Sequence, residues 1–151
     1  MIMVLFGPPG CGKGTQAGII AKDIDIPHLS TGDMLRDAVK SETETGLKAA
    51  SIMEEGKLVS DEIVIDIIKD RICNNDCKNG FILDGFPRTV SQAKELDFML
   101  TSENMKLDLV VDFSVNDEAL ISRIEGRFSC GDCGAGYNDH TKLPAKEGIC
   151  D

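Results

Sequence analysis

The chain has 151 residues, with 16 Lys and Arg against 26 Asp and Glu, which gives a formal net charge of -10. Its 42% hydrophobic and 28% charged residues are typical of a soluble globular protein, and the length suits one compact domain with a sizeable core. The negative charge disfavours a broad nucleic-acid-binding face and an anionic membrane surface. No apolar run approaches the roughly 20 residues that span a bilayer, and no secretory signal is visible, so the expected location is the cytoplasm.

The first part of the chain predicts a strand, a helix and a second strand. Met1 to Phe6 is continuously apolar, which is typical of a strand buried on both faces. After a glycine- and proline-rich turn, apolar residues recur at helical spacing from Lys13 to Asp23. A short strand is predicted around residues 26–29. This order indicates a right-handed crossover between two parallel strands.

Three helices are predicted next. Two are small and amphipathic, around residues 34–39 and 47–53, and a polar stretch separates them. Ser60 is the predicted N-cap of the third, over residues 61–72, whose first two residues are acidic and suit the positive end of a helix.

The rest of the chain continues the alternation and then changes character. The predicted elements are a buried strand at 81–83, a helix over 90–100, a strand over 109–115 and a helix over 117–124. This alternation predicts a doubly wound α/β fold, with a parallel sheet and helices on both faces. After Gly126 the sequence is rich in Cys, Gly, Asp, Asn, Lys and Pro and has little periodicity, which predicts a small inserted lobe.

The sequence GPPGCGKGT at residues 7–15 follows the first strand and opens a helix, as a phosphate-binding loop does. Its glycines allow backbone N–H groups to surround phosphate oxygens, and Lys13 adds a positive charge. The usual Ser or Thr after the lysine is replaced by Gly14, and the hydroxyl comes one residue later, at Thr15. This departure argues against a GTPase or a motor ATPase. The plainer alternative is a turn that only joins a strand to a helix.

The five arginines are unevenly distributed. Arg36 and Arg88 follow glycine turns, and Arg123 and Arg127 lie one helical turn apart beside the cysteine-rich lobe. As a set, these guanidinium groups indicate a local phosphate clamp, although each alone suits a surface ion pair. Asp84, at the end of a strand, fits either a magnesium role through water or a turn and capping role.

Three of the six cysteines have the spacing of a metal site. Cys130-x-x-Cys133 is followed by sixteen residues and Cys150, which matches three places of a four-ligand zinc knuckle. His140 is a conceivable fourth ligand, whereas Asp151 is disfavoured because adjacent residues seldom reach one tetrahedral ion. A redox Cys-x-x-Cys is the competing interpretation, but that motif normally opens a helix after a strand.

These segments together resemble adenylate kinase, in the bacterial form whose lid carries zinc. The resemblance extends over essentially the whole chain, and besides the phosphate loop it rests on the segments at residues 29–36, 56–61, 80–92 and 123–133. It implies a fold like that of the P-loop nucleoside monophosphate kinases. The implied parts are a core over 1–29 and 60–122, a helical AMP-binding lobe over 30–59 and a partial lid over 123–151.

The resemblance also implies the reaction ATP + AMP to 2 ADP, with Mg²⁺ on the donor. The implied catalytic residues are Lys13, Asp84, Arg88 and Arg123. The implied ATP-binding residues are Gly10, Cys11, Gly12, Lys13, Gly14, Thr15, Arg127, Gly136 and Tyr137. The implied AMP-binding residues are Thr31, Arg36, Lys57, Leu58, Val59, Gly85, Phe86, Pro87, Arg88 and Gln92. The arginines would bind phosphate and Gln92 the adenine edge, and a structural Zn²⁺ would be bound by Cys130, Cys133 and Cys150.

In the resembling family the chain continues beyond this length, with a fourth zinc ligand three residues after Cys150 and further arginines. Two hypotheses therefore stand: a kinase that acts on AMP, and a non-catalytic module that binds nucleotide and zinc. A nucleic-acid-binding zinc knuckle is disfavoured, because the last segment has few basic or aromatic residues. We expect a monomer with ATP and AMP as its partners, without nucleic acid or membrane.

Overall fold

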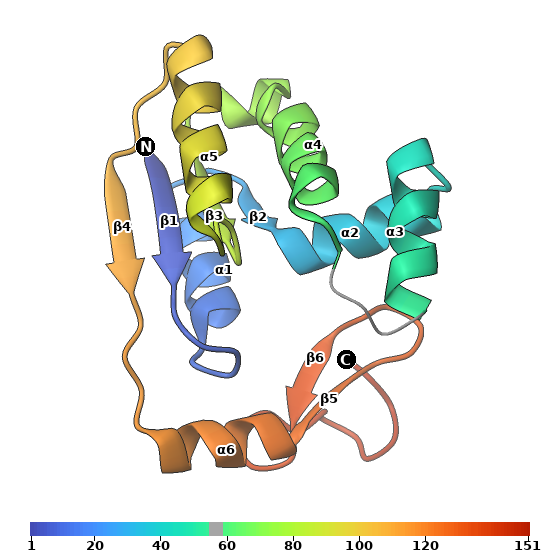
Figure 1. Ribbon diagram of the computed structural model, residues 1–151. Helices are drawn as coiled ribbons and strands as arrows, with labels where there is room; N and C mark the ends of the chain where they lie inside the picture. The colour runs from blue at the N-terminus through green and yellow to red at the C-terminus, as the bar shows by residue number, and fades with distance from the viewer. Residues whose placement is uncertain (55–58) are drawn as a thin grey trace. The chain divides into compact units, whose positions relative to one another are not determined.

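The computed structural model describes residues 1–54 and 59–151 (Figure 1). The chain divides into two compact units, which we describe separately. The first comprises Met1–Phe6 and Lys13–Asp112, and the second comprises Gly7–Gly12 and Phe113–Asp151. The division into a core, an AMP-binding lobe and a lid stays a prediction.

The first unit is built on a parallel sheet of four strands, in the order β2-β3-β1-β4. The strands are β1 (Ile2–Phe6), β2 (His28–Ser30), β3 (Phe81–Asp84) and β4 (Leu109–Asp112). Asp84 is in register with Leu5 of β1 and with Ser30 of β2, so the carboxyl ends of these strands meet at one edge of the sheet. The predicted strands are confirmed, but β2 begins at His28 instead of residue 26, and β4 ends at Asp112 instead of residue 115.

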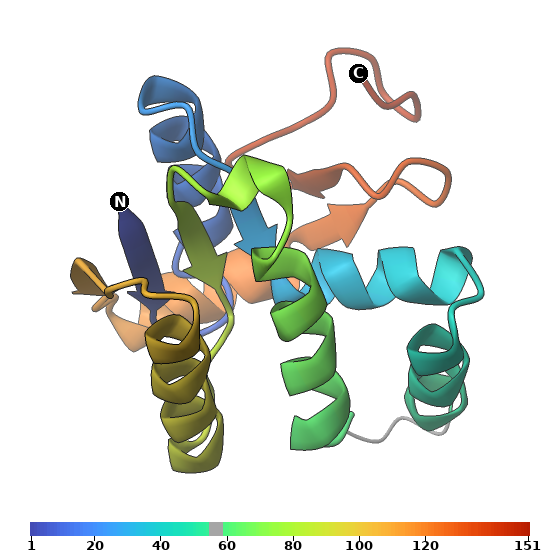
Figure 2. The ribbon, with the colours of Figure 1, turned by 90° about the horizontal axis from the view of Figure 1, so that it is seen from above.

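Helices cover both faces of this sheet, as predicted for a doubly wound fold. In order they are α1 (Lys13–Asp23), α2 (Thr31–Lys40), α3 (Glu44–Glu54), α4 (Asp61–Ile72), a 3₁₀ turn at Asn75–Cys77 and α5 (Val90–Ser102). Figure 2 shows α1 on one side of the strands and α4 and α5 on the other. In the described part of the chain, none of the helices combines the length and apolarity needed to cross a membrane.

The hydrophobic core explains why β1 is apolar at consecutive positions. Ile2 and Val4 belong to the cluster that packs with Leu96 and Leu100 of α5. Successive side chains of a strand point to opposite faces, so Met3 and Leu5, which are also buried, lie on the other face. The prediction that this strand is buried on both faces is confirmed.

The helix N-termini of the first unit differ in how they are capped. Ser60 occupies the predicted N-cap position of α4, but its side chain makes no capping hydrogen bond. In contrast, the hydroxyl of Ser30 accepts a hydrogen bond from Asp33 N at the start of α2, and Thr89 caps α5 through Gln92 N. The expected position is therefore confirmed for Ser60, and the expected capping bond is absent.

The second unit contains α6 (Asp117–Glu125) and an antiparallel pair, β5 (Arg127–Ser129) and β6 (Gly136–Asn138). The side chain of Asn116 caps α6 by accepting a hydrogen bond from Ala119 N, at 2.9 Å. The β5–β6 pair was not predicted, because its strands, RFS and GYN, contain no apolar run and lie in a segment rich in glycine and cysteine. The ring of Phe128 stacks on that of Tyr137, with centroids 5.6 Å apart.

Candidate active site

The first part of the phosphate loop, Gly7–Gly12, belongs to the second unit. Gly10 and Gly12 have φ of +83° and +98°, in the region that favours glycine. A Cβ added at Gly10 would lie 2.9 Å from Cγ1 of Ile124 in α6, so the loop approaches that helix closely. The guanidinium of Arg123, also in α6, donates to the carbonyl oxygen of Cys11 at 3.5 Å. Two of the predicted ATP-side residues, Cys11 and Arg123, are thus brought together.

The last part of the loop, Lys13, Gly14 and Thr15, forms the first turn of α1 in the first unit. A Cβ added at Gly14 would lie 3.3 Å from Oδ2 of Asp84, at the end of β3. The same carboxylate oxygen lies 3.3 Å from Nε2 of His28. A side chain at position 14 would crowd Asp84, which gives a physical reason for glycine where phosphate loops usually carry a hydroxyl.

Thr31, Gly85 and Arg88 form a tight cluster beside Asp84. The hydroxyl of Thr31, a residue only 3% exposed, donates to the carbonyl oxygen of Gly85 at 3.2 Å. Arg88 donates from Nε to the same carbonyl oxygen at 2.7 Å and from Nη2 to the hydroxyl of Thr31 at 3.4 Å. Gly85 has a φ of +81°, and a Cβ there would lie 2.8 Å from Oγ1 of Thr31. These contacts fix the position of the Arg88 guanidinium.

The carboxamide of Gln92 is also held by protein groups. Its Oε1 accepts from the backbone N–H of Arg88 at 2.6 Å, and its Nε2 donates to Oδ1 of Asp61 at 2.6 Å. The other carboxylate oxygen of Asp61 accepts from the hydroxyl of Thr89 at 2.8 Å. The start of α5 is therefore bonded to the start of α4 through a single carboxylate.

Among the remaining predicted AMP-side residues, the structure describes Arg36, Val59, Phe86 and Pro87. Arg36, with a side chain 61% exposed, donates to Oδ1 of Asp33. Burial raises the pKa of Asp33, but the hydrogen bonds with Arg36 and Ser30 outweigh it, so this pKa lies below its ordinary value. Val59 is half-buried. Two further predictions, Lys57 and Leu58, lie outside the described residues, and Phe86 and Pro87 connect Gly85 to Arg88, with Phe86 in the core.

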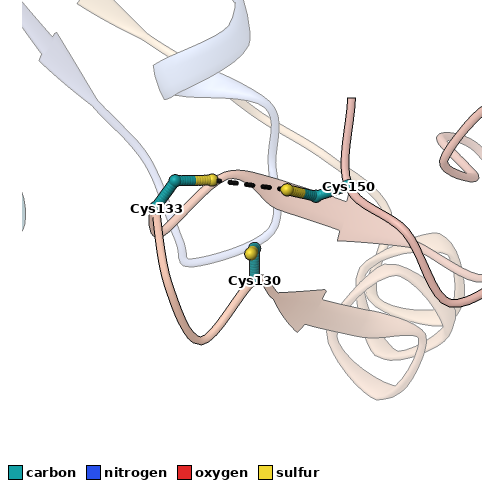
Figure 3. Close-up of side chains that lie close together, drawn as sticks. All are labelled: Cys130, Cys133 and Cys150. Atoms are coloured by element: carbon teal, nitrogen blue, oxygen red, sulfur yellow. Dashed lines mark hydrogen bonds between the residues drawn. The ribbon is translucent and has the colours of Figure 1, made fainter.

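The sulfur atoms of Cys130, Cys133 and Cys150 lie within 4.8 Å of one another (Figure 3). Two sulfur ligands about 2.3 Å from a tetrahedral zinc ion lie about 3.8 Å apart. The Sγ atoms of Cys133 and Cys150 are 3.7 Å apart, so this pair fits such an ion. The carboxylate of Asp151 accepts instead from Ala145 N at 2.8 Å, consistent with its exclusion as a ligand.

The acidities of these thiols differ. Hydrogen bonds from the backbone N–H groups of Cys133 and Asp132 lower the pKa of Cys130 to about 7. The sulfurs of Cys130 and Cys133 raise the pKa of Cys150 to about 11. Since zinc binds thiolates, Cys130 offers a thiolate at a lower pH than Cys150 does.

The lid-side residues Arg127, Gly136 and Tyr137 lie on the β5–β6 pair. Tyr137 is 5% exposed, stacks on Phe128, and accepts a hydrogen bond from Asp151 N at 2.7 Å. These contacts support its interpretation as the packing anchor of the lobe. Its role towards ATP stays a prediction, as do those of Arg127 and Gly136.

Sequence reasoning missed two contributors to the site. His28, which no sequence motif singles out, lies against Asp84. Asp61 was assigned to the charge at the start of a helix, and it binds Gln92. The pattern Thr89-x-x-Gln92 is that of a capping box, which was a usable signal for an ordered α5 start. Nothing local connects that motif to Asp61, because the contact depends on how two helices pack.

The parallel sheet, the phosphate loop after β1 and the cluster of Thr31, Gly85 and Arg88 after β2 and β3 define the class of P-loop nucleoside monophosphate kinases. The family model of adenylate kinase matches residues 5–147. Curated adenylate kinases are similar over all 151 residues, among them those of Rhizobium etli (54% identical), Caldicellulosiruptor bescii (52%) and Methanocella arvoryzae (50%). The matches cover 100% of this chain and 70% of each relative. The chain belongs to the adenylate kinase family.

Proposed function

We propose that this chain transfers the γ-phosphoryl group of ATP to AMP reversibly, giving two ADP and serving adenine nucleotide homeostasis. The observation that carries the proposal is the position of Asp84. Its carboxylate lies against the first turn of α1, which the phosphate loop opens, and the chain continues directly into the Gly85–Arg88 cluster. Donor-side and acceptor-side groups of the first unit therefore meet at one edge of the sheet.

The proposed mechanism relies on alignment and positive charge, because phosphoryl transfer needs little covalent chemistry from the protein. Lys13 and the N-terminus of α1 would bind the ATP phosphates. Arg36 and Arg88 would hold the AMP phosphate in line, with Arg88 oriented by Thr31 and Gly85. Arg123 would add charge from the loop side. Mg²⁺ bound to the donor neutralises phosphate charge, and Asp84 is the residue that we assign to its hydration shell.

The acceptor assignment rests on Thr31 and Gln92. Both are buried, and both lie within the cluster that contains Arg88. A carboxamide has two N–H donors and an oxygen with two lone pairs, so Gln92 keeps one donor and one acceptor site beyond its contacts with Arg88 and Asp61. These complement N1 and the N6 amino group of adenine. AMP is therefore the acceptor that we propose.

We further propose that Cys130, Cys133 and Cys150 bind a structural zinc ion. The three sulfurs lie within 4.8 Å of one another and one pair is 3.7 Å apart, and cysteine sulfurs are usual ligands of structural zinc. The exposed position of Cys133 and Cys150 supports a role in ordering the lobe, since the two are not part of an apolar core. A cytoplasmic, monomeric protein without nucleic-acid or membrane partners is the accompanying proposal.

The test follows ATP, AMP and Mg²⁺ by ³¹P NMR with the 151-residue chain. We expect ADP to form, and we expect Lys13→Ala to reduce the rate by at least about 10²-fold, because a fixed charge on the phosphates is lost. Lys22→Ala, an exposed lysine in the last turn of the same helix, is the matched control and should keep the rate. A folded chain that binds both nucleotides without forming ADP would instead support the alternative, a non-catalytic module that binds nucleotide and zinc.

A further inference from the structure

Asp61 occupies an unusual position for a carboxylate in the first turn of a helix. It accepts hydrogen bonds from two groups of another element, Nε2 of Gln92 and the hydroxyl of Thr89, at 2.6 and 2.8 Å. Glu62, the next residue of α4, is exposed. Asp61 is therefore the residue of this helix turn that reaches the acceptor-side residues of α5.

The two partners of Gln92 determine which way its carboxamide points. The backbone N–H of Arg88 is only a donor, so the amide oxygen must face it. The ionised carboxylate of Asp61 is only an acceptor, so the amide nitrogen must face it. Because Gln92 is 4% exposed, water does not readily replace either partner. A flipped carboxamide would place its NH₂ group against the N–H donor of Arg88 and its oxygen against the carboxylate acceptor of Asp61.

A fixed carboxamide distinguishes purines that differ at position 6. Adenine donates from its amino group and accepts at N1, whereas hypoxanthine accepts at O6 and donates from N1. A carboxamide that is free to flip pairs with either base, and one that is fixed pairs with one of them. The preference for adenine then depends on the groups that prevent the flip.

We propose that Asp61 is a positioning residue for acceptor specificity, which holds the carboxamide of Gln92 in the orientation that accepts AMP and rejects inosine monophosphate. This inference rests on the proposed function, in which Gln92 meets the adenine edge. Asp61 itself touches no substrate in this account and acts through Gln92. The second oxygen of the Asp61 carboxylate accepts from the hydroxyl of Thr89, the N-cap of α5, and this contact does not involve the carboxamide of Gln92.

The experiment is isothermal titration calorimetry of AMP and of inosine monophosphate with the 151-residue chain and its variants. The critical variant is Asp61→Asn, which keeps the size of the side chain. An asparagine amide can offer either its oxygen or its nitrogen to Gln92, so it no longer selects one orientation. We expect the ratio of AMP affinity to inosine monophosphate affinity to fall about tenfold, while ATP affinity stays unchanged.

Two further variants separate orientation from folding. Glu62→Gln removes the same charge from the same helix turn without touching Gln92, and it should keep the wild-type ratio. Thr89→Val removes one contact of the Asp61 carboxylate and the cap of α5 but leaves the bond between Asp61 and Gln92. It should lower the melting temperature and leave the ratio near the wild-type value.

The proposal is overturned if Asp61→Asn keeps the wild-type ratio of AMP affinity to inosine monophosphate affinity. It is overturned as well if this ratio falls equally in Asp61→Asn and Thr89→Val, because selectivity would then follow stability. It is also overturned when Gln92→Ala keeps the preference for AMP. Failure of the proposed kinase function would give a different result. The chain would form no ADP in the ³¹P NMR experiment, while its preference for AMP would still depend on Asp61.

Discussion

Thr31, Gly85, Arg88 and Gln92 form the acceptor-side cluster of the first unit, which we propose to bind AMP. This cluster and the cysteine lobe of the second unit are organised in different ways. In the acceptor-side cluster, buried Thr31 and Gln92 hold their neighbours through hydrogen bonds, and a hydrophobic core lies beneath them. In the cysteine lobe, over residues 127–151, Cys133 and Cys150 are exposed. The first region is held by a buried hydrophobic core and hydrogen bonds, whereas in the second region the zinc ion that we propose would supply much of the order. This difference predicts how each region responds to perturbation.

The largest expected effect is the response of the cysteine lobe to removal of zinc. Structural zinc sites contribute roughly 10 kcal/mol or more of apparent binding free energy, so a chelator or Cys133→Ser should leave residues 127–150 without stable order. Amide hydrogen exchange followed by mass spectrometry should show protection lost there and kept in α4 and α5. Cys73→Ser, at an exposed helix end, is the control. If the amides of the lobe stay protected after chelation, the lobe does not depend on zinc for its order, and the proposed difference between the two regions is wrong.

Next in size is Gly85→Ala in the acceptor-side cluster. The new Cβ would meet Oγ1 of Thr31 at 2.8 Å and Nη2 of Arg88 at 3.1 Å, on a backbone with φ of +81°. We expect the free energy of unfolding to fall by roughly 2 kcal/mol and AMP affinity to fall by about 10²-fold. Denaturant titration and calorimetry measure the two effects. Gly18→Ala in α1, where a Cβ meets nothing within 4 Å, should instead be neutral or slightly stabilising.

A smaller effect is expected from pH on zinc affinity. Zinc binds thiolates, so protons compete with it and affinity falls as pH falls. The pKa of Cys150, about 11, keeps this thiol protonated at neutral pH, so zinc binding displaces at least one proton. Each displaced proton should change the zinc affinity about tenfold per pH unit. Below the pKa of Cys130, about 7, the proton on this thiol must be displaced as well, which should steepen the dependence of zinc affinity on pH. Competition with a chelator at pH 6, 7 and 8 measures this slope, and a flat profile would contradict the assignment of these thiols as ligands.

The smallest expected effect is that of Lys142→Gln in the lobe. The Nζ of Lys142 lies 5.3 Å from the centroid of the Tyr137 ring, and such exposed cation–π contacts contribute about 0.5–1 kcal/mol. We expect zinc affinity to fall by no more than a few fold, since the ordering of the lobe and the binding of zinc are coupled. Lys146→Gln, which changes the same charge elsewhere in the lobe, is the matched control. A much larger loss in Lys142→Gln would show that aromatic packing, and not the metal, dominates the order of the lobe.

Patterns with strong local causes were predictable. The unbroken apolar run before residue 7 predicted β1, and the helical spacing after Lys13 predicted α1 with its bounds. The spacing of Cys130, Cys133 and Cys150 predicted three sulfurs that do lie together. In contrast, the β5–β6 pair was not predicted, because neither strand contains an apolar run that local sequence could reveal.

The sequence alone determined the alternation of strands and helices, the glycine-rich loop, and the residue types available for phosphate and metal, since each depends on neighbours along the chain. Only the tertiary structure decided that Asp84 lies against Gly14, that Thr31 bonds to Gly85, and that Asp61 holds Gln92. These contacts join residues 31 to 70 positions apart. Their existence depends on strand register and on the packing of α4 against α5, which no local pattern specifies.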